Sequence, residues 1–545
     1  MTEAAETEFL REFLARLAGT DPDPDAVFAL RIAETGLFAL TRDLSPVPGV
    51  AVVGPTQTGK STVVNLLAGG EYVETSPLAA HTRHAAVLAV NTGLDTDHMP
   101  DFHAAGLAVD PLQVVQDGPA RLIWDTPDFD SNAAAVYRQE TARVCALADV
   151  VVVVVSREKY ADQSVWGVLE TIAALDVPTI LCLNKCDNDA ETRILVEAIR
   201  RRFNEHPEVV GNIALYTLPM LPARDGGTAL SRVEDFRCAV FDSLQRRSGK
   251  ARRAGLARLI RANWTAWVAP VEQELACQRE WKALIADQTD SFLARYRSEY
   301  IDHSKHHDVA QKAILGLLEL LEIPGLAGPL GRTRRVLTWP FRRLASALGA
   351  GGEAERDKEL DVLDAAIDHY LLSLRGEVSV RRHPWWRALE GELAGREPEL
   401  KQAFRHAVDE YRKAFQPRID DLSNQLYARL QRNPTTLNAL RATRVGADAG
   451  GIAIAFNTGT LGLYDALFAP AVVSLTSYLA ESVVGQYLRS VIAGLKREQH
   501  EQVSAIIHED VARPLESLQP RGPGLFGISR AGLERARRGL EALER

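Results

Sequence analysis

The residue pattern with the clearest chemistry is the run GPTQTGKS at residues 54–61, which has the spacing GxxxxGK[ST]. In such a loop the backbone N–H groups surround a phosphate, the lysine reaches the β- and γ-oxygens, and the serine hydroxyl binds Mg²⁺. The run follows the apolar residues 49–53 and opens an apolar helical stretch, as this motif requires. We therefore expect a nucleoside triphosphate with Mg²⁺ here, bound by Gly54, Thr56, Gln57, Thr58, Gly59, Lys60, Ser61 and Thr62.

A second pattern, Asn184-Lys185-Cys186-Asp187, follows the apolar run 179–183. Ligands of open α/β sheets bind at such carboxyl ends of strands. The pattern resembles the NKxD motif of the Ras-like GTPase superfamily. The resemblance implies that Asp187 accepts hydrogen bonds from guanine, that Lys185 packs across the base and that Asn184 braces the phosphate loop. A carboxylate opposite two donors rejects adenine, so GTP and GDP are the expected nucleotides.

A third pattern, Asp125-Thr126-Pro127-Asp128, stands where the superfamily has DxxG. The resemblance implies that Asp125 holds Mg²⁺, directly or through water. Asp128 replaces the glycine. Its backbone N–H can still face the γ-phosphate, but we expect its carboxylate to point away from that charge. Phe129 follows where Ras-like proteins keep a water-orienting glutamine, so another group must position the water.

The superfamily also supplies a threonine to Mg²⁺ from switch I, just before the second strand. Thr82 occupies that place, with Thr75 as the runner-up. Arg83 stands where an arginine of the same chain can reach the transferred phosphoryl group, an effect worth ~10³ to 10⁵ in rate where it occurs. A surface salt bridge is the alternative for Arg83. The expected catalytic residues are Lys60, Thr82 and Arg83, and the expected Mg²⁺ ligands are Ser61, Thr82 and Asp125.

A sheet must bring these patterns together. Candidate strands lie at 49–53, 85–90, 121–124, 149–155, 179–183 and 212–217. Fully apolar runs such as 150–155 indicate strands that are buried on both faces. The sequence therefore predicts an α/β P-loop GTPase domain over residues 46–248, with a mostly parallel, doubly wound sheet.

Helical patterns fill the rest of the chain. Residues 1–45 read as an N-terminal helical segment, which we expect to pack on the C-terminal helices. Residues 249–545 predict a large, elongated all-α domain, a stalk or bundle. Helix breaks are expected at Pro324, Pro329, Pro340, Gly349 to Gly352, Pro384, Pro417, Pro434 and Gly446 to Gly451.

Composition excludes several classes of protein. The 545 residues include 63 Lys and Arg against 72 Asp and Glu, a net charge of −9, so no nucleic-acid partner is expected. The five scattered cysteines indicate neither a disulfide framework nor a zinc site. The acidic start does not resemble a secretory signal, and no stretch has the ~20 unbroken apolar residues of a confident transmembrane helix. We expect a cytoplasmic protein, with peripheral association at the inner face of the membrane as a further possibility.

Two stretches of the helical half differ from the rest. Residues 445–488 contain no Lys or Arg and read as an apolar hairpin, which suits either insertion in lipid or the centre of a soluble bundle. Residues 324–350 interleave five arginines with aromatic and aliphatic residues and contain no acid. Such a stretch suits an anionic membrane surface, at ~1 kcal/mol per basic residue. Pairing of these arginines with acids of neighbouring helices is the alternative.

The order of parts, with helices on both sides of a GTPase domain and a lipid-compatible tip, resembles the bacterial dynamin-like proteins. The resemblance implies hydrolysis of GTP to GDP, a homodimer through the GTPase domains and membrane association of the helical region. A soluble regulatory switch whose helical domain binds a protein is the first alternative, and a ribosome- or RNA-associated GTPase is the second.

Overall fold

The structure is a computed structural model. It describes residues 3–21, 23–42, 47–75, 84–92, 102–103, 105–107, 109, 111–116, 118–130, 134–206, 213–220, 228–245, 249–303, 339–432 and 483–545. For residues 339–358 and 483–489 only the backbone is considered. The chain divides into two units, which are described separately: unit 1 contains Met1–Ala276 and Gly522–Arg545, and unit 2 contains Cys277–Arg521.

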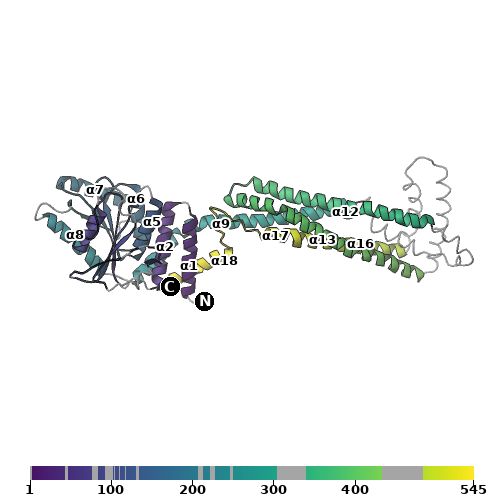
Figure 1. Cartoon of the computed structure of the whole chain (residues 1–545), viewed down its shortest axis with the longest axis horizontal. Helices are drawn as coiled ribbons and strands as arrows, with labels where there is room; N and C mark the ends of the chain where they lie inside the picture. The colour runs from purple at the N-terminus through teal and green to yellow at the C-terminus, as the bar shows by residue number, and fades with distance from the viewer. Residues whose placement is uncertain are drawn as a thin grey trace, which may run out of the picture. The chain divides into compact units, whose positions relative to one another are not determined.

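Unit 1 is built on a seven-stranded sheet with the order β3-β2-β4-β1-β5-β6-β7 (Figure 1). The strands are β1 (Gly49–Val53), β2 (Ala86–Val90), β3 (Pro111–Val114), β4 (Arg121–Asp125), β5 (Val150–Val155), β6 (Thr179–Leu183) and β7 (Ile213–Thr217). All neighbouring pairs are parallel except β2 with β4. The predicted mostly parallel α/β sheet is therefore confirmed.

The strands at the centre of the sheet carry the residues that lead into the three motifs. Strands β1, β4, β5 and β6 are buried along their whole length. In the register of β1 with β4, Val52 lies opposite Asp125, and Val53 of β1 lies opposite Val153 of β5. The carboxyl ends of these strands therefore meet at one edge of the sheet, where parallel α/β sheets bind their ligands.

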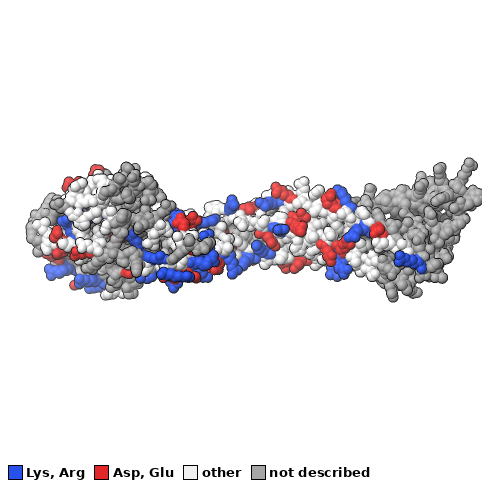
Figure 2. Space-filling view, turned by 90° about the horizontal axis from the view of Figure 1, so that it is seen from below, with Lys and Arg blue, Asp and Glu red and all other residues white. Residues whose placement is uncertain are grey.

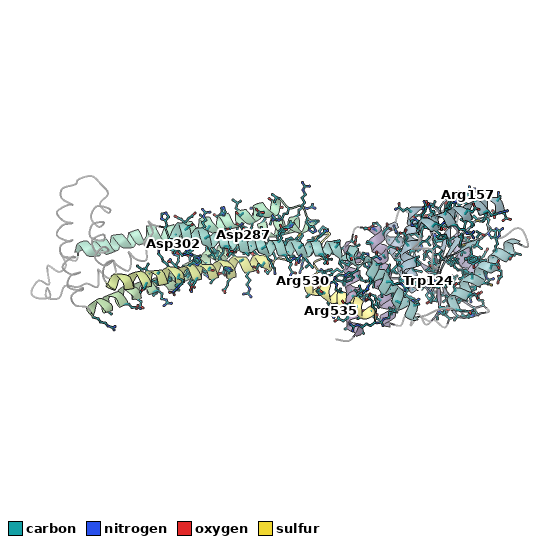
Figure 3. All side chains as sticks on the ribbon, turned by 180° about the vertical axis from the view of Figure 1, so that it is seen from behind. Trp124, Arg157, Asp287, Asp302, Arg530 and Arg535 are labelled. Carbon is teal, nitrogen blue, oxygen red and sulfur yellow. The ribbon has the colours of Figure 1, made fainter. Side chains whose placement is uncertain are left out.

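Helices cover the sheet and form a smaller layer beside it. They are α1 (Glu3–Thr20), α2 (Pro24–Arg42), α3 (Lys60–Ala68), α5 (Ala134–Leu147), α6 (Gln163–Ala174), α7 (Asp189–Glu205), α8 (Thr228–Gln245), the first part of α9 (Gly249–Tyr296) and α18 (Arg530–Leu543). In Figure 1 the purple helices α1 and α2 lie beside the yellow α18; α1 packs on both α2 and α18, and α2 packs on α5. Trp124 of β4 is among the buried side chains of unit 1 (Figure 3).

Residues from the two ends of the sequence meet in this helical layer. Phe13 of α1 stacks on Trp264 of α9, with ring centroids 5.8 Å apart. The buried carboxylate of Glu274 on α9 accepts hydrogen bonds from the backbone N–H groups of Phe526 at 2.8 Å and Gly527 at 2.9 Å. A carboxylate that accepts two backbone donors avoids the cost of a buried, unpaired charge. These contacts join the last residues of the chain to α9 within unit 1.

Unit 2 is helical in its described part, as the sequence predicts. It contains the remainder of α9, the π-helical turn η3 (Arg297–Ile301), α12 (Trp339–Ser379), α13 (Pro384–Gln431), α16 (Val483–Ile506), a second π-helical turn η4 (Ile507–Ala512) and α17 (Arg513–Glu516). Its core is rich in aromatic residues such as Trp281, Trp385 and Phe404. The indole N–H of Trp281 donates to the carbonyl of Leu515 at 3.0 Å.

Two of the predicted helix breaks are wrong, because helices continue through Gly349 to Gly352 and through Pro417. Pro340 is the second residue of α12, where a backbone N–H has no intrahelical partner to lose. Pro417 lies inside α13 and removes one hydrogen bond. The same helix buries Phe404 and Phe415, and such tertiary packing contributes more to a long helix than one backbone bond.

The two unusual stretches of the sequence fall on parts of the chain that the structure does not describe. Residues 324–338 and 445–482 lie outside the described residues, and for 339–350 and 483–488 only helical backbone is described. Among the described helices, none combines the length and the apolar character needed to cross a bilayer.

Candidate nucleotide-binding site

The phosphate loop, residues 54–61, connects β1 to the first turn of α3. Gly59, at the start of α3, has a left-handed backbone with φ +89°. A Cβ on Gly54 would lie 2.3 Å from the carbonyl oxygen of Val154, so the loop also passes close to β5. Because the loop leads directly into a helix N-terminus, its N–H groups and the helix dipole favour the same anion.

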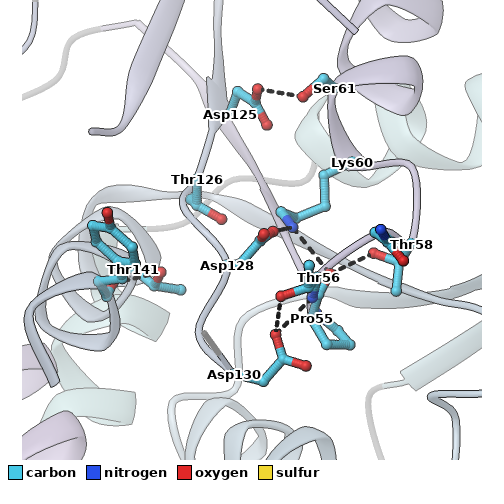
Figure 4. A network of polar contacts seen from close by, with 12 residues as sticks. Pro55, Thr56, Thr58, Lys60, Ser61, Asp125, Thr126, Asp128, Asp130 and Thr141 are labelled. Atoms are coloured by element: carbon cyan, nitrogen blue, oxygen red, sulfur yellow. Dashed lines mark hydrogen bonds and ion pairs between the residues drawn. The ribbon is translucent and has the colours of Figure 1, made fainter. Parts of the chain in front are cut away.

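Lys60 is buried and its ammonium has two partners at this site. It donates to the carbonyl oxygen of Pro55 at 3.1 Å and forms an ion pair with Asp128 (Figure 4). We expected the Asp128 carboxylate to point away from the charge of the γ-phosphate, but in the structure it pairs with Lys60, the lysine expected to contact that phosphate. In a buried setting a carboxylate is stabilised by the nearest cation, and here that cation is Lys60.

Ser61 and Asp125 are in contact with each other close to Lys60. The Ser61 hydroxyl donates to Oδ2 of Asp125 at 2.8 Å. Burial raises the pKa of Asp125 to about 6, although the Ser61 hydrogen bond and Lys60 act in the opposite direction. Among the described residues, Oδ1 of Asp125 is buried and has no hydrogen-bond partner. A serine hydroxyl beside an incompletely satisfied carboxylate is an oxygen donor set that fits Mg²⁺.

The loop after β6 crosses over the phosphate loop. The side-chain amide of Asn184 donates to the carbonyl oxygen of Thr58 at 2.9 Å. Lys185 has a left-handed backbone with φ +64°, and its ammonium donates to the carbonyl oxygen of Gln57 at 2.7 Å. These two contacts fix the position of the exposed Asp187, whose Oδ1 accepts from the backbone N–H of Met220 at 2.8 Å.

A second set of contacts on the phosphate loop was not predicted from the sequence. Oδ1 of Asp130 accepts from both the backbone N–H and the hydroxyl of Thr56, each at 2.6 Å. Oδ2 of Asp130 accepts from the ammonium of Lys159 at 2.9 Å. Burial alone would raise the pKa of Asp130, but the hydrogen bonds from Thr56 and Lys159 together lower it. The three acids at positions 125, 128 and 130 indicate a functional segment in the sequence, but their spacing does not predict which groups each side chain contacts.

Three further expectations concern the reacting side of the site. Phe129 is buried in the core of unit 1, so its side chain cannot orient a water molecule. Thr82 and Arg83 lie outside the residues that the structure describes. The runner-up Thr75 is described and is exposed. The described site therefore contains the phosphate loop with Lys60 and Ser61, Asp125, and the loop after β6 with residues 184–187, here called the base loop.

Replacing Gly59 with alanine tests the crossing of these two loops. A Cβ there would lie 2.5 Å from Nδ2 of Asn184, so this side-chain amide must move away and its bond to Thr58 should weaken. We expect at least a ~10-fold weaker affinity for a fluorescent GDP analogue, since the loop loses its brace and an alanine at positive φ is strained by ~1 kcal/mol.

The matched control is Gly69→Ala at the other end of α3. Gly69 is also left-handed, with φ +73°, but its Cβ would meet only the end of the Gln116 side chain. Equal losses of GDP affinity in the two variants would show that general strain, and not the loop crossing, determines affinity.

One family model matches the part of the chain that contains these motifs. Residues 49–185 match the family model described as 50S ribosome-binding GTPase. No curated protein matches the sequence.

Solved structures give distant matches. Era in complex with MgGDPNP and a fragment of 16S ribosomal RNA matches with 20% identity and a TM-score of 0.26, over 36% of this chain and 57% of that chain. The chain thus spans little more than half of the Era chain. A chain of an oligomerised bacterial dynamin pair matches with 12% identity and a TM-score of 0.46, over 100% of this chain and 96% of that one. The bacterial dynamin GTPase LeoA from ETEC matches with 12% identity and a TM-score of 0.25, over 93% of this chain and 97% of that one.

The family match spans the phosphate loop, the acidic residues after β4 and the first two residues of the base-binding pattern. The same residues are the ones that the fold brings to one edge of the sheet. The chain therefore contains a P-loop GTPase domain, the class of domain that binds and hydrolyses GTP.

Proposed function

We propose that this chain is a Mg²⁺-dependent enzyme that hydrolyses GTP to GDP and phosphate, and that its nucleotide state controls the helical region. The observation that supports the catalytic part best is the contact of the two other motifs with the phosphate loop. Ser61 contacts Asp125, Thr58 contacts Asn184, and Gln57 contacts Lys185. A loop that is held by three contacts from two neighbouring segments presents its N–H groups to a phosphate without reorganisation.

The residues divide the work between binding and charge stabilisation. Ser61 and Asp125 would hold Mg²⁺, which supplies positive charge to the β- and γ-phosphate oxygens when bound, and Thr82 is the proposed third protein ligand. Lys60 places its ammonium on the same oxygens. Asp187 selects guanine, while Asn184 and Lys185 keep the base loop against the phosphate loop. Catalysis then comes from positioning and electrostatic stabilisation.

Nucleotide turnover by the full chain tests this proposal. We expect phosphate release from GTP with Mg²⁺, little release from ATP, and none when EDTA removes the metal. Ser61→Ala should raise the Mg²⁺ concentration needed for half-maximal turnover by at least ~10-fold, because the hydroxyl beside Asp125 is lost. Thr171→Ala, which removes a hydroxyl from α6 away from the phosphate loop, is the control. Equal turnover of ATP and GTP would contradict the assignment.

The coupling part of the proposal rests on the sequence. Residues 324–350 offer arginines with aromatic residues, and residues 445–488 offer an apolar stretch without Lys or Arg. We propose that these stretches bind an anionic membrane surface and that GTP promotes a homodimer through the GTPase domains. Liposome flotation of the wild-type chain is expected with anionic vesicles, and a charge reversal of Arg332, Arg334 and Arg335 should abolish it.

Dimerisation is tested separately by sedimentation velocity. We expect a dimer with a non-hydrolysable GTP analogue and a monomer with GDP. A chain that turns over GTP but neither floats nor changes its mass would instead be a soluble switch with a protein partner.

A ribosome-associated GTPase is the second candidate, favoured by the description of the matching family model. The net charge of −9 opposes it, since affinity for RNA depends on Lys and Arg that neutralise phosphates. In Figure 2 the described surface of unit 2 shows acidic and basic side chains side by side. In unit 2, Lys401 pairs with Asp368 and Arg405 pairs with Asp364. Co-sedimentation with 50S subunits that persists at raised salt would favour this candidate.

A further inference from the structure

We propose that Lys159 stabilises the charge of the transferring phosphoryl group, and that Asp130 is the positioning residue that holds Lys159 against the phosphate loop. The proposal rests on the proposed GTP hydrolysis. In that reaction the oxygen of water bonds to the γ-phosphorus while the bond to the β,γ-bridging oxygen breaks. GDP leaves, and the protons of the water pass to phosphate and solvent.

Lys159 belongs to the loop that follows β5, and this loop is fixed by its own hydrogen bonds. The backbone N–H groups of Lys159 and Tyr160 both donate to the carbonyl oxygen of Ser156 at 3.0 Å. The indole N–H of Trp166 donates to the carbonyl oxygen of Tyr160, also at 3.0 Å. Trp166 is buried, so the loop is anchored to the core of unit 1. The lysine therefore starts from a defined position.

Asp130 directs the end of this side chain. Its Oδ2 accepts from the Lys159 ammonium at 2.9 Å, while its Oδ1 holds the N–H and hydroxyl of Thr56 in the phosphate loop. The Asp130 carboxylate therefore links the Lys159 ammonium to Thr56 of the phosphate loop. Asp128 pairs in the same way with Lys60. The site therefore contains two lysine–aspartate ion pairs, Lys60 with Asp128 and Lys159 with Asp130. Figure 4 shows Asp128 and Asp130 facing the phosphate loop.

The site has a chemical need for such a cation. Phe129 is buried, so the position that bears a water-orienting glutamine in Ras-like proteins contributes no polar group. Two of the charged groups near the phosphates, Asp128 and Asp130, are negative and would repel the γ-phosphate unless each is neutralised. The Lys159 ammonium pairs with Asp130 at 2.9 Å and with Asp162 at 3.2 Å, so one of its three N–H donors is left for a phosphate oxygen, and 35% of its side chain is exposed. A cation that is held in place stabilises developing charge without reorganisation.

Single-turnover and steady-state kinetics of Lys159→Met test the proposal. We expect kcat for GTP to fall at least ~10-fold, while the Kd for a fluorescent GDP analogue changes less than ~2-fold, since the stabilisation is made in the transition state. Aluminium fluoride tightens GDP binding when a site stabilises a transferring phosphoryl group, and this tightening should be lost in Lys159→Met. Lys159→Arg keeps the charge and should keep kcat within ~3-fold.

Two further variants separate positioning from simple structure. Asp130→Asn keeps an acceptor for Thr56 but loses the ion pair, so kcat should fall while GDP affinity stays. Asp162→Asn is the matched control, because Asp162 is the other carboxylate near Lys159, at 3.2 Å, and has no described contact with the phosphate loop. It should leave kcat unchanged.

These experiments distinguish failure of the Lys159 proposal from failure of the proposed GTP hydrolysis. If the wild-type chain does not turn over GTP, the proposed function fails. If wild type turns over GTP and Lys159→Met keeps both its kcat and the response to aluminium fluoride, only the role of Lys159 is overturned. A Lys159→Met chain that loses GDP affinity and kcat together would also overturn it, since the contact would then be structural.

Discussion

Replacing Lys60 with methionine is expected to lower GTP turnover at least ~10³-fold, because the γ-phosphate loses the one cation that the phosphate loop itself supplies. The effect should appear in kcat/KM, measured as phosphate release under Mg²⁺. The substitution also has a second consequence in this chain. Lys60 is the partner of Asp128, and the side chains are only 6% and 11% exposed. Methionine leaves that carboxylate buried and without its cation.

A double variant separates these two effects. Removing one partner of a buried ion pair costs about 3 kcal/mol of folding free energy, so Lys60→Met alone should lower the Tm of the chain. Lys60→Met with Asp128→Asn replaces the charge by a neutral amide and should recover most of the Tm, while turnover stays lost. If the double variant recovered turnover as well, Lys60 would act through stability and the catalytic assignment would be wrong.

Replacing Asp128 alone is expected to have a smaller effect, and in the opposite direction to Lys60→Met. Its carboxylate competes with a phosphate for the ammonium of Lys60. Asp128→Asn removes that competition and one negative charge near the γ-phosphate, so the affinity for a non-hydrolysable GTP analogue should rise. Isothermal titration calorimetry measures the change, and an unchanged or weaker affinity would contradict it. This expectation differs from the sequence interpretation, in which the carboxylate turned away from the site.

Much of the α/β fold could be predicted because its strands are short, buried and apolar. The run 150–155 consists of six valines, and such a run fits a strand that is covered on both faces. β3 (Pro111–Val114) was not predicted. It begins with a proline, alternates poorly and lies at the edge of the sheet with Leu112 exposed, so its pairing with β2 comes from tertiary context. The continuation of α13 through Pro417 was missed for the same reason.

The residues of the candidate site could also be predicted only in part. The phosphate loop, Asn184 and Asp125 could be predicted because their chemistry depends on residue type and on spacing within a short segment. Asp130 and Lys159 could not, since they are 29 positions apart and their contact depends on how the loop after β5 folds over the acidic residues. The direction of Asp128 was missed because sequence gives no account of which cation a buried carboxylate reaches. Contacts between side chains of different loops are set by the fold.

Replacing Asp187 with asparagine is expected to change the preferred base from guanine to xanthine. Guanine offers an N–H and an amino group side by side, and a carboxylate accepts from both. Asparagine accepts one bond and donates another, which matches xanthine, where a carbonyl replaces the amino group. We expect GTP affinity to fall ~10²-fold and affinity for xanthosine triphosphate to rise, since the mismatched base leaves one hydrogen-bonding group without its partner.

The contact with Met220 should allow this substitution to change the contact with the base without changing the loop. In the structure Oδ1 of Asp187 accepts from the N–H of Met220, and the Oδ1 of asparagine can accept the same bond. The amide NH₂ is then directed to the other side, where the carboxylate had its second oxygen. The loop should keep its shape, so Tm should be unchanged while nucleotide preference changes. Asp189→Asn, which removes a surface partner of Arg232, is the matched control and should leave GTP preferred. Loss of affinity for both nucleotides by Asp187→Asn, with Tm retained, would show that Asp187 does not read the base.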